Sequence, residues 1–535
     1  MLIILKKLFY GDNLDVLKNF QYDSVDLIYL DPPFNSKLDY NVIFKNSDSK
    51  HTDSQIQAFE DTWSWGMQSE SEYDQLFSIE NTEFIEIISS LRNFLGENDL
   101  MAYLVMISSR LIQLHRVLKS TGSLYFHCDN TASHYIKIIL DGIFGPANFR
   151  SEIIWKRTFA HSDSKSFGNN TDRIFLYTKS SDYIFNPVLV PYEQKYIERF
   201  NREDPDGRKW QDDSLSAKGL SGGGYEYEYK GVSAYWRCPI ETMERLDKEN
   251  RLHFTKNGGI RLKSYLDEKK GRFCQSLWED IPPLNSQSKE RLGYPTQKPL
   301  SLLERIIKAS SKENDVILDP FCGCGTAIHA AEKLHRNWIG IDITHLAISL
   351  IEKRLKDAFN LSCEVEGTPK DLSGAKDLAF RDKYQFQWWA CSLVNAIPYK
   401  NKKKGADGGI DGLIFFNDSH GKKQKIIVSV KGGKNISVAM IRELIQVVNR
   451  EKGSIGIFVT LFKPTEPMLK EGIKEGFYKL DNLDKKYPKI QIITIEELLN
   501  KTNSPKYPFK TFGNLGFKKA SREENELINQ GKLNL

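Results

Sequence analysis

Short apolar runs that end in an acidic residue are the feature that most constrains the fold of this chain. VDLIYLD ends at Asp31, VILD ends at Asp319, and NWIGID ends at Asp342. Segments with helical periodicity, such as EFIEIISSLRNFL and AIHAAEKLHR, alternate with these buried strands. This alternation predicts an α/β fold built on a mainly parallel sheet.

The pattern changes along the 535 residues, a length that suggests about two to four domains. The sheet pattern is interrupted by short aromatic and Gly-rich pieces such as SGGGYEYEYKGVSAYWRC, and it then returns, so an insert is expected between two halves of one sheet. The predicted first sheet half, insert, second sheet half, linker, third α/β domain and C-terminal tail span residues 1–148, 149–293, 294–359, 360–376, 377–501 and 502–535.

Composition excludes several classes of protein. No uninterrupted apolar run is long enough to cross a bilayer, so no membrane role is expected. The seven cysteines are scattered without CxxC spacing, which argues against a disulfide framework or a zinc knuckle and favours the cytoplasm. A net charge of +5 mildly favours a polyanionic partner, but charge alone does not establish nucleic-acid binding.

The segment VILDPFCGCGT (316–326) carries the first chemical signal. Gly323 and Gly325 let the backbone turn tightly and approach a ligand, and the following helix offers free N–H groups to a carboxylate or phosphate. Asp342 ends the next strand, at the spacing expected for the acid that accepts hydrogen bonds from ribose hydroxyls. A purely structural Gly turn is the alternative for the first motif, but the pair favours a nucleoside site.

The tetrapeptide Asp31, Pro32, Pro33 and Phe34 carries the second signal. An exocyclic base amine is a poor nucleophile because its lone pair is delocalised into the ring, so catalysis needs oxygens that accept its N–H hydrogens. The carboxylate of Asp31 and the carbonyl of Pro32 can supply them in a geometry that the prolines stiffen. Phe34 offers a flat face to a base rotated out of the duplex. A proline-rich turn without function is the alternative.

Together LDPPF, YPTQKP and DPFCGCGT resemble the motifs of bacterial DNA amino-methyltransferases. Their order, with the catalytic motif first, resembles the permuted β class, which includes type III modification subunits. The resemblance extends to Phe359 and implies a permuted Rossmann-like class I methyltransferase sheet with a target-recognition insert. It also implies S-adenosylmethionine as the cofactor and double-stranded DNA as the substrate.

The same resemblance implies roles for single residues. Asp12, in the GD motif, contacts the cofactor adenine in this class, and the TQKP motif begins the helix that lies against the methionine part. The implied cofactor-binding residues are Asp12, Thr296, Gln297, Lys298, Pro299, Asp319, Phe321, Gly323, Gly325, Thr326 and Asp342.

The target base is also suggested by the family pattern. Asp at the position of Asp31 is usual for N6-adenine enzymes, whereas N4-cytosine enzymes more often have Ser, so N6 of adenine is favoured over N4 of cytosine. No metal is expected for methyl transfer, since the nitrogen would attack the cofactor methyl group directly. A zinc site at Cys322 and Cys324 is not expected either, because no partner ligands are spaced nearby. His127 and Asp129 either line the base pocket or only end a strand.

The third segment resembles the core of the PD-(D/E)xK restriction-endonuclease superfamily. Asp411 in GADGGIDGLIFF would be the metal-binding acid, and Lys431 in KIIVSVKGGK would position or activate water. Ser429 replaces the usual acid or Gln, and a hydroxyl is a weaker ligand for Mg²⁺ than a carboxylate. We therefore expect a nuclease-like DNA-binding domain whose cleavage is in doubt. Trp388 and Trp389, in the preceding helix, are expected to be core residues.

The sequence thus predicts a site-specific N6-adenine DNA methyltransferase of a restriction-modification or phage-defence system, bacterial or phage-encoded. One alternative is a bifunctional enzyme with a Mg²⁺-dependent nuclease in its third domain. Another is a non-catalytic DNA-binding protein that has kept the fold. A separate restriction subunit and a homodimer are left open.

Overall fold

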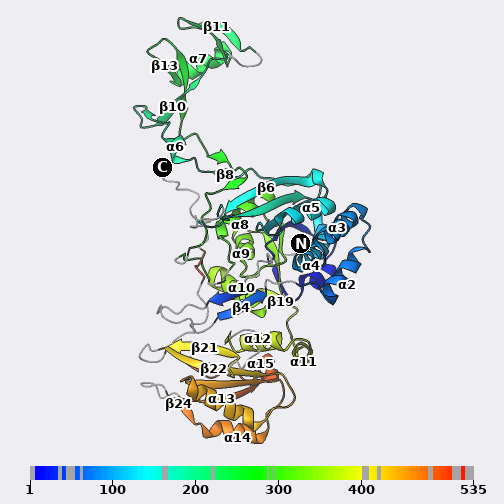
Figure 1. Cartoon of the computed structure of the whole chain (residues 1–535). Coiled ribbons are helices and arrows are strands. Elements are labelled where there is room, and N and C mark those ends of the chain that lie inside the picture. Colours follow the sequence, from blue (N-terminus) through cyan, green and yellow to red (C-terminus); the bar gives the residue numbers. More distant parts are fainter. Residues whose placement is uncertain are drawn as a thin grey trace. The chain divides into compact units, whose positions relative to one another are not determined.

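A computed structural model describes residues 6–33, 39–43, 55–60, 64–159, 167–218, 223–285, 288–292, 294, 296–399, 409–417, 423–479, 486–508 and 520–523 (Figure 1). The chain divides into two compact units: Pro187–Gln275 forms one, and Met1–Asn186 with Ser276–Leu535 forms the other. Phe34 lies outside the described residues. None of the helices in the described ranges is long and apolar enough to span a bilayer.

The main sheet of the larger unit has the strand order β16-β6-β7-β5-β2-β17-β18-β1-β19. Neighbouring strands from β5 to β19 are parallel, whereas β7 is antiparallel to both β5 and β6. The strands are β1 (Lys6–Tyr10), β2 (Val25–Leu30), β5 (Leu118–Cys128), β6 (Phe149–Lys156), β7 (Thr171–Thr178), β16 (Leu277–Trp278), β17 (Val316–Asp319), β18 (Asn337–Asp342) and β19 (Glu364–Glu366).

The two predicted sheet halves are joined where β2 pairs with β17. Ile317 lies opposite Leu27, and Leu318 lies opposite Ile28, so segments from the two ends of the methyltransferase-like region are neighbours. All residues of β2 are buried, as expected for a parallel strand covered on both faces. The predicted permuted Rossmann-like sheet is confirmed.

The boundaries of the insert differ between the sequence pattern and the structure. The predicted insert, 149–293, includes β6 and β7, yet both strands belong to the main sheet. The separate compact unit is shorter, at Pro187–Gln275. The short strands of this region contain scattered aromatic and basic residues without a regular period. The sequence therefore did not show where the main sheet ends and where the smaller unit begins.

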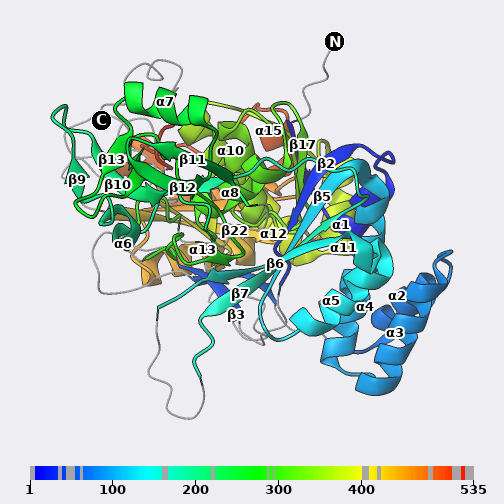
Figure 2. The same ribbon diagram turned by 90° about the horizontal axis from the view of Figure 1, so that it is seen from above.

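Helices cover the main sheet. Asn98 caps the long helix α4, because its side chain accepts a hydrogen bond from the backbone N–H of Met101. Helices α3, α4 and α5 pack against one another (Figure 2). The helices of this region are α1 (Asn13–Lys18), α2 (Met67–Leu76), α3 (Thr82–Leu95), α4 (Asp99–Val117), α5 (Ser133–Phe144), η1 (Pro146–Asn148), α8 (Leu300–Ser310), α9 (Thr326–Lys333) and α10 (His345–Phe359).

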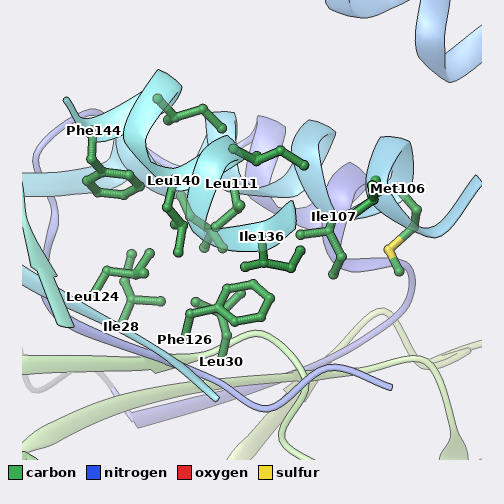
Figure 3. Close-up of a cluster of buried hydrophobic side chains, with 14 of the residues drawn as sticks. Ile28, Leu30, Met106, Ile107, Leu111, Leu124, Phe126, Ile136, Leu140 and Phe144 are labelled. Atoms are coloured by element: carbon green, nitrogen blue, oxygen red, sulfur yellow. The ribbon is translucent and has the colours of Figure 1, made fainter. Parts of the chain in front are cut away.

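Side chains from α4 and α5 meet those from β2 and β5 in a single apolar cluster (Figure 3). Leu111 and Ile136 point from the helices toward Ile28 and Phe126 on the strands, and all four are fully buried. Removing such surface from water is the main favourable term in folding, at roughly 25 cal/mol per Å². This core fixes the position at which β2 ends.

The C-terminal part of the larger unit has its own sheet, with the order β20-β21-β22-β23-β26. Strands β21 and β22 are antiparallel and are followed by α13, as the resemblance to an endonuclease core predicts. Its elements are α11 (Leu372–Arg381), α12 (Lys383–Leu393), β20 (Ile397–Pro398), β21 (Gly412–Asn417), β22 (Lys423–Lys431), α13 (Val438–Arg450), β23 (Ile455–Thr460), α14 (Glu466–Lys474), β24 (Phe477–Lys479), β25 (Lys486–Pro488), β26 (Ile490–Thr494) and α15 (Ile495–Leu499).

The smaller unit has a sheet in the order β13-β14-β10-β9, a β11–β12 hairpin and helix α7. Trp236, Met243 and Leu252 contribute to its apolar core. Its elements are β8 (Leu189–Val190), α6 (Gln194–Ile197), β9 (Arg202–Glu203), β10 (Lys209–Ser214), β11 (Tyr225–Tyr229), β12 (Val232–Trp236), α7 (Ile240–Lys248), β13 (Leu252–Phe254), β14 (Ile260–Tyr265) and β15 (Arg272–Phe273). Outside this unit, β3 (Asp39–Ile43) pairs with β4 (Gln55–Glu60).

Candidate active site

The carboxyl ends of β2, β17, β18 and β1 lie next to one another at one edge of the main sheet. Tyr10 is opposite Asp342, and Asp319 is opposite Gly340, so the strand ends are in close register. Ligands of open α/β sheets bind at this edge. A cavity of about 370 Å³ lies there.

Most residues that the sequence singled out are brought together around this cavity. Its lining includes Asp12, Asp31, Pro32, Pro33, Thr296, Gln297, Lys298, Asp319, Phe321, Gly323, Thr326 and Asp342. Pro299 and Gly325 are not part of this lining. Pro299 is the N-cap of α8 and Gly325 is the N-cap of α9, so each lies where a helix begins beside lining residues.

The Gly-rich turn requires glycine at two positions. Gly323 and Gly325 have φ values of +48° and +72°, which L side chains rarely adopt. A Cβ on Gly325 would lie 2.7 Å from Cγ1 of Ile351. Behind the turn, the buried Arg354 donates to the carbonyl of Cys324 at 3.0 Å and to Oγ1 of Thr326 at 3.2 Å. These hydrogen bonds from Arg354 therefore hold the turn in one conformation.

Asp342 links the end of β18 to this turn. Its Oδ2 accepts from the N–H of Gly323 at 2.9 Å, and its Oδ1 accepts from the N–H and hydroxyl of Thr344 at 2.8 and 2.9 Å. Burial raises the pKa of Asp342 to about 6 despite these donors. A carboxylate oxygen can accept more than one hydrogen bond, so both oxygens keep capacity for ribose hydroxyls.

Arg110 on α4 contacts Asp12, and sequence reasoning missed it. Its Nη2 lies 3.0 and 3.1 Å from the two carboxylate oxygens of Asp12, and its Nε donates to Oδ1 of Asn13 at 2.8 Å. Asn13 in turn donates to the carbonyl of Pro320 at 2.8 Å. This network ties the GD motif to the Gly-rich turn. An arginine inside the apolar helix sequence MAYLVMISSRLI was the signal available.

Asp31 and Lys298 form an ion pair inside the cavity wall. The Nζ of Lys298 lies 2.5 Å from Oδ2 of Asp31, and the two side chains are only 11% and 16% exposed. Nearby, Gln297 accepts from the N–H of Leu292 at 2.8 Å and donates to the carbonyl of Glu290 at 2.7 Å. The TQKP segment is thereby fixed, and its lysine is held on the catalytic-motif aspartate.

A buried polar network lies behind Tyr29, which also lines the cavity. The hydroxyl of Tyr29 is 2.9 Å from Nδ1 of His127, and Nε2 of His127 is 3.1 Å from Oδ2 of Asp172. Burial favours a raised pKa for Asp172, but its hydrogen bond with His127 and the neighbouring cations hold that pKa below the ordinary value. His127 is fully buried, so the structure favours its strand-end role over a place in the base pocket.

The predicted nuclease residues also lie together, at the start of β21 and the end of β22. Oδ2 of Asp411 is 3.3 Å from Oγ of Ser429 and 3.8 Å from Nζ of Lys431. The same oxygen accepts from the N–H of Val430 at 2.6 Å, while Oδ1 accepts from Gln387 at 3.0 Å. Both oxygens of Asp411 therefore already have protein donors. Within the described residues, no group of three or more His, Cys, Asp or Glu side chains is arranged to hold a metal ion.

Family models match both the methyltransferase-like region and the third domain. The model of the N6/N4 DNA methylase family matches residues 25–353. Residues 390–500 match the family described as NACHT-associated inactive restriction endonuclease 1. The expected resemblance to the endonuclease fold is thus supported, but the expected PD-(D/E)xK identity is not confirmed, and the matched family is described as inactive.

Curated relatives come from restriction-modification systems. The type II methyltransferase M.EcaI of Enterobacter cloacae is 32% identical over 259 residues, which are 47% of this chain and 57% of that protein. The Mod subunit of the type III enzyme StyLTI of Salmonella typhimurium is 31% identical over 350 residues, 61% of this chain and 49% of that protein. The chain therefore spans about half the length of these relatives.

Solved structures give more distant matches. The M1.HpyAVI complex with S-adenosylmethionine is 16% identical, with a TM-score of 0.31 over 66% of this chain and 100% of that chain. The N4-cytosine-specific PvuII DNA methyltransferase is 11% identical, with a TM-score of 0.29 over 65% of this chain and 85% of that chain.

Proposed function

The chain belongs to the N6/N4 DNA methylase family, and from this premise we propose that it transfers a methyl group from S-adenosylmethionine to N6 of adenine at a specific site in duplex DNA. The observation that carries the proposal is the position of Asp31. Its carboxylate is part of the wall of the cavity that the Gly-rich turn also lines, and it forms an ion pair with Lys298.

The residues around the cavity fit the proposed cofactor. Asp342 offers carboxylate oxygens to the ribose hydroxyls. Asp12, which Arg110 positions, follows the end of β1, and we assign the adenine to this strand end. The N–H groups at the start of α9 suit the methionine carboxylate. When bound, S-adenosylmethionine supplies an electrophilic methyl group.

Asp31 and Pro32 activate the amine in this proposal. The amine donates its N–H hydrogens to the Asp31 carboxylate and to the Pro32 carbonyl, which returns lone-pair density to the nitrogen. Lys298 occupies Oδ2 of Asp31, and we assign Oδ1 to the amine. With S-adenosylmethionine bound, the activated nitrogen would take up its methyl group, and the Asp31 carboxylate, held by Lys298, would accept the proton that the nitrogen then loses. Holding these groups in place supplies much of the rate enhancement.

Adenine is proposed over cytosine because Asp31 occupies the position where N4-cytosine enzymes of this family more often have Ser. The family itself covers both amines. The target must leave the base stack to reach a cavity at the sheet edge, and a flipped base is what an enzyme acting on a duplex amine requires.

Recognition of the DNA site is proposed for the smaller unit, Pro187–Gln275. Large aromatic side chains are exposed on it, among them Tyr225 (52%), Tyr235 (49%) and Phe254 (46%). Exposed aromatic and basic groups suit contacts with bases and phosphates. Because type III Mod subunits are among the relatives, a separate restriction subunit remains a proposed partner.

Transfer of labelled methyl groups to unmethylated DNA by the full chain tests the proposal. Asp31→Ala is expected to abolish transfer while S-adenosylmethionine still binds in calorimetry. Asp15→Ala is the matched control, because Asp15 is 79% exposed on α1. Retained transfer by Asp31→Ala would falsify the assigned role of this carboxylate.

A further inference from the structure

Helix α12, which belongs to the endonuclease-like domain, contributes side chains to the cavity. Asp382, Gln385 and Trp388 are part of its lining. They are spaced three residues apart, so they share one face of the helix. The sequence analysis placed Trp388 in the core; the structure corrects this, because Trp388 lines the cavity whereas its neighbour Trp389 is 3% exposed in the core.

An adjacent face of α12 packs into the C-terminal domain. Phe386, Trp389 and Ala390 belong to the apolar cluster that also contains Ile414 and Val428 of the C-terminal sheet. Asp382 caps the helix by accepting from the N–H groups of Tyr384 and Gln385 at 2.9 and 3.1 Å. The helix is thus anchored in the core of this domain, and its other face carries the residues that line the cavity.

Gln385 is joined to the end of β1. The hydroxyl of Tyr10 donates to Oε1 of Gln385 at 3.0 Å, and Tyr10 lies opposite Asp342 in the sheet. The ring of Tyr10 also lies against the ring of His345, with centroids 3.7 Å apart. Gln385 therefore lies beside the strand ends to which the adenine and ribose of the cofactor are assigned.

An apolar contact holds the two domains together near the same place. Leu346 and Leu350 of α10 share one buried cluster with Ile397 and Leu413 of the C-terminal sheet. Because α10 begins directly after Asp342 and Thr344, the contact extends to the wall of the cavity.

We propose that α12 completes the cofactor site, with the Gln385 amide on an edge of the adenine and the Trp388 ring against its face, so that the C-terminal domain is coupled to cofactor binding. The inference rests on the proposed function for its ligand. A glutamine amide matches the paired donor and acceptor of adenine, and an indole covers a purine face. The nuclease-like domain thereby has a role as the outer wall of the methyltransferase site, and this role requires no cleavage of DNA.

The coupling acts in both directions. If docking of the C-terminal domain strengthens the binding of S-adenosylmethionine, the cofactor strengthens docking by the same factor. Displacement of this domain would then weaken cofactor binding by that factor, and loss of the cofactor would weaken docking of the domain by the same factor.

Calorimetric titration of S-adenosylmethionine into the full chain tests the proposal. Gln385→Ala and Trp388→Ala are each expected to weaken binding by roughly tenfold, the effect of one lost hydrogen bond or ring contact. Lys383→Ala, at an exposed position on the same helix, is the control and should bind as the wild type does. In methylation assays the KM for S-adenosylmethionine should rise while kcat at saturation is kept.

Hydrogen exchange in the wild type gives a second readout that needs no variant. Exchange of the α12 amides, Lys383–Leu393, should slow when S-adenosylmethionine is added. Unchanged affinity of both variants, or unchanged exchange of α12 on a chain that binds the cofactor, would overturn the inference and leave the proposed function standing. A wild-type chain that binds no S-adenosylmethionine would overturn both.

Discussion

Lys298 places its ammonium 2.5 Å from Oδ2 of Asp31, and this pair joins the TQKP motif to the DPPF motif across 267 positions of sequence. Both side chains are largely buried, so water screens the attraction less than it would screen a pair at the surface. The cofactor-binding half thus positions the carboxylate of the catalytic half.

Replacing Lys298 tests this positioning role. Lys298→Met removes the charge that fixes Asp31, so we expect kcat for methyl transfer to fall by roughly 10- to 100-fold, as for a misplaced catalytic group. Initial rates at saturating S-adenosylmethionine measure it. Lys308→Met on α8 is the control, because its side chain is 53% exposed. An unchanged kcat would show that the ion pair has no part in catalysis.

Cofactor affinity should depend on pH through Asp342. Burial raises its pKa to about 6, so the carboxylate is charged above that pH and accepts from ribose hydroxyls, whereas below it the carboxyl is protonated. Affinity for S-adenosylmethionine should therefore fall as the pH drops from about 7 to 5. Asp342→Asn should bind more weakly at pH 7 and lose this dependence. The same pH dependence in wild type and Asp342→Asn would assign the titration to another group.

The buried network behind the cavity contributes to stability. Tyr29→Phe removes the hydroxyl that lies 2.9 Å from Nδ1 of His127, and we expect a loss of about 1–2 kcal/mol because a buried polar contact is broken. Thermal unfolding measures the shift. Tyr22→Phe, at a side chain that is 71% exposed, is the comparison. Equal melting temperatures for the two variants would contradict the structural role of the network.

The endonuclease-like domain is not expected to cut DNA. Both oxygens of Asp411 accept from protein donors, and Ser429 supplies no second carboxylate for Mg²⁺. The full chain with Mg²⁺ should leave methylated and unmethylated plasmids intact, while Asp411→Ala should lower the stability of the domain by about 1–3 kcal/mol. Mg²⁺-dependent cleavage that Asp411→Ala abolishes would establish the bifunctional alternative.

Motifs at strand ends made much of the site predictable. The sequence placed Asp31, Asp319 and Asp342 at the ends of buried strands, and parallel pairing brings such ends to one edge. The family pattern assigned Lys298 to the cofactor site. It did not predict the contact between Lys298 and Asp31, because an ion pair between distant segments depends on the folded sheet.

Residues outside the motifs could not be found in the same way. Arg110 lies in an apolar helix, where only the fold reveals that Asp12 faces it. Trp388 and Trp389 are adjacent aromatic residues, and the sequence offers no sign that one faces the cavity and the other the core. Which face of α12 is covered depends on how two domains pack.

The most direct test of the central claim is base-resolved sequencing of DNA from a methylation-free host that expresses either the wild-type chain or Asp31→Ala. The account predicts N6-methyladenine at one recurrent motif with the wild type and none with the variant. N4-methylcytosine would contradict the assignment of the base. The absence of any mark from a folded, expressed wild-type chain, or the same mark with Asp31→Ala, would contradict the proposed chemistry.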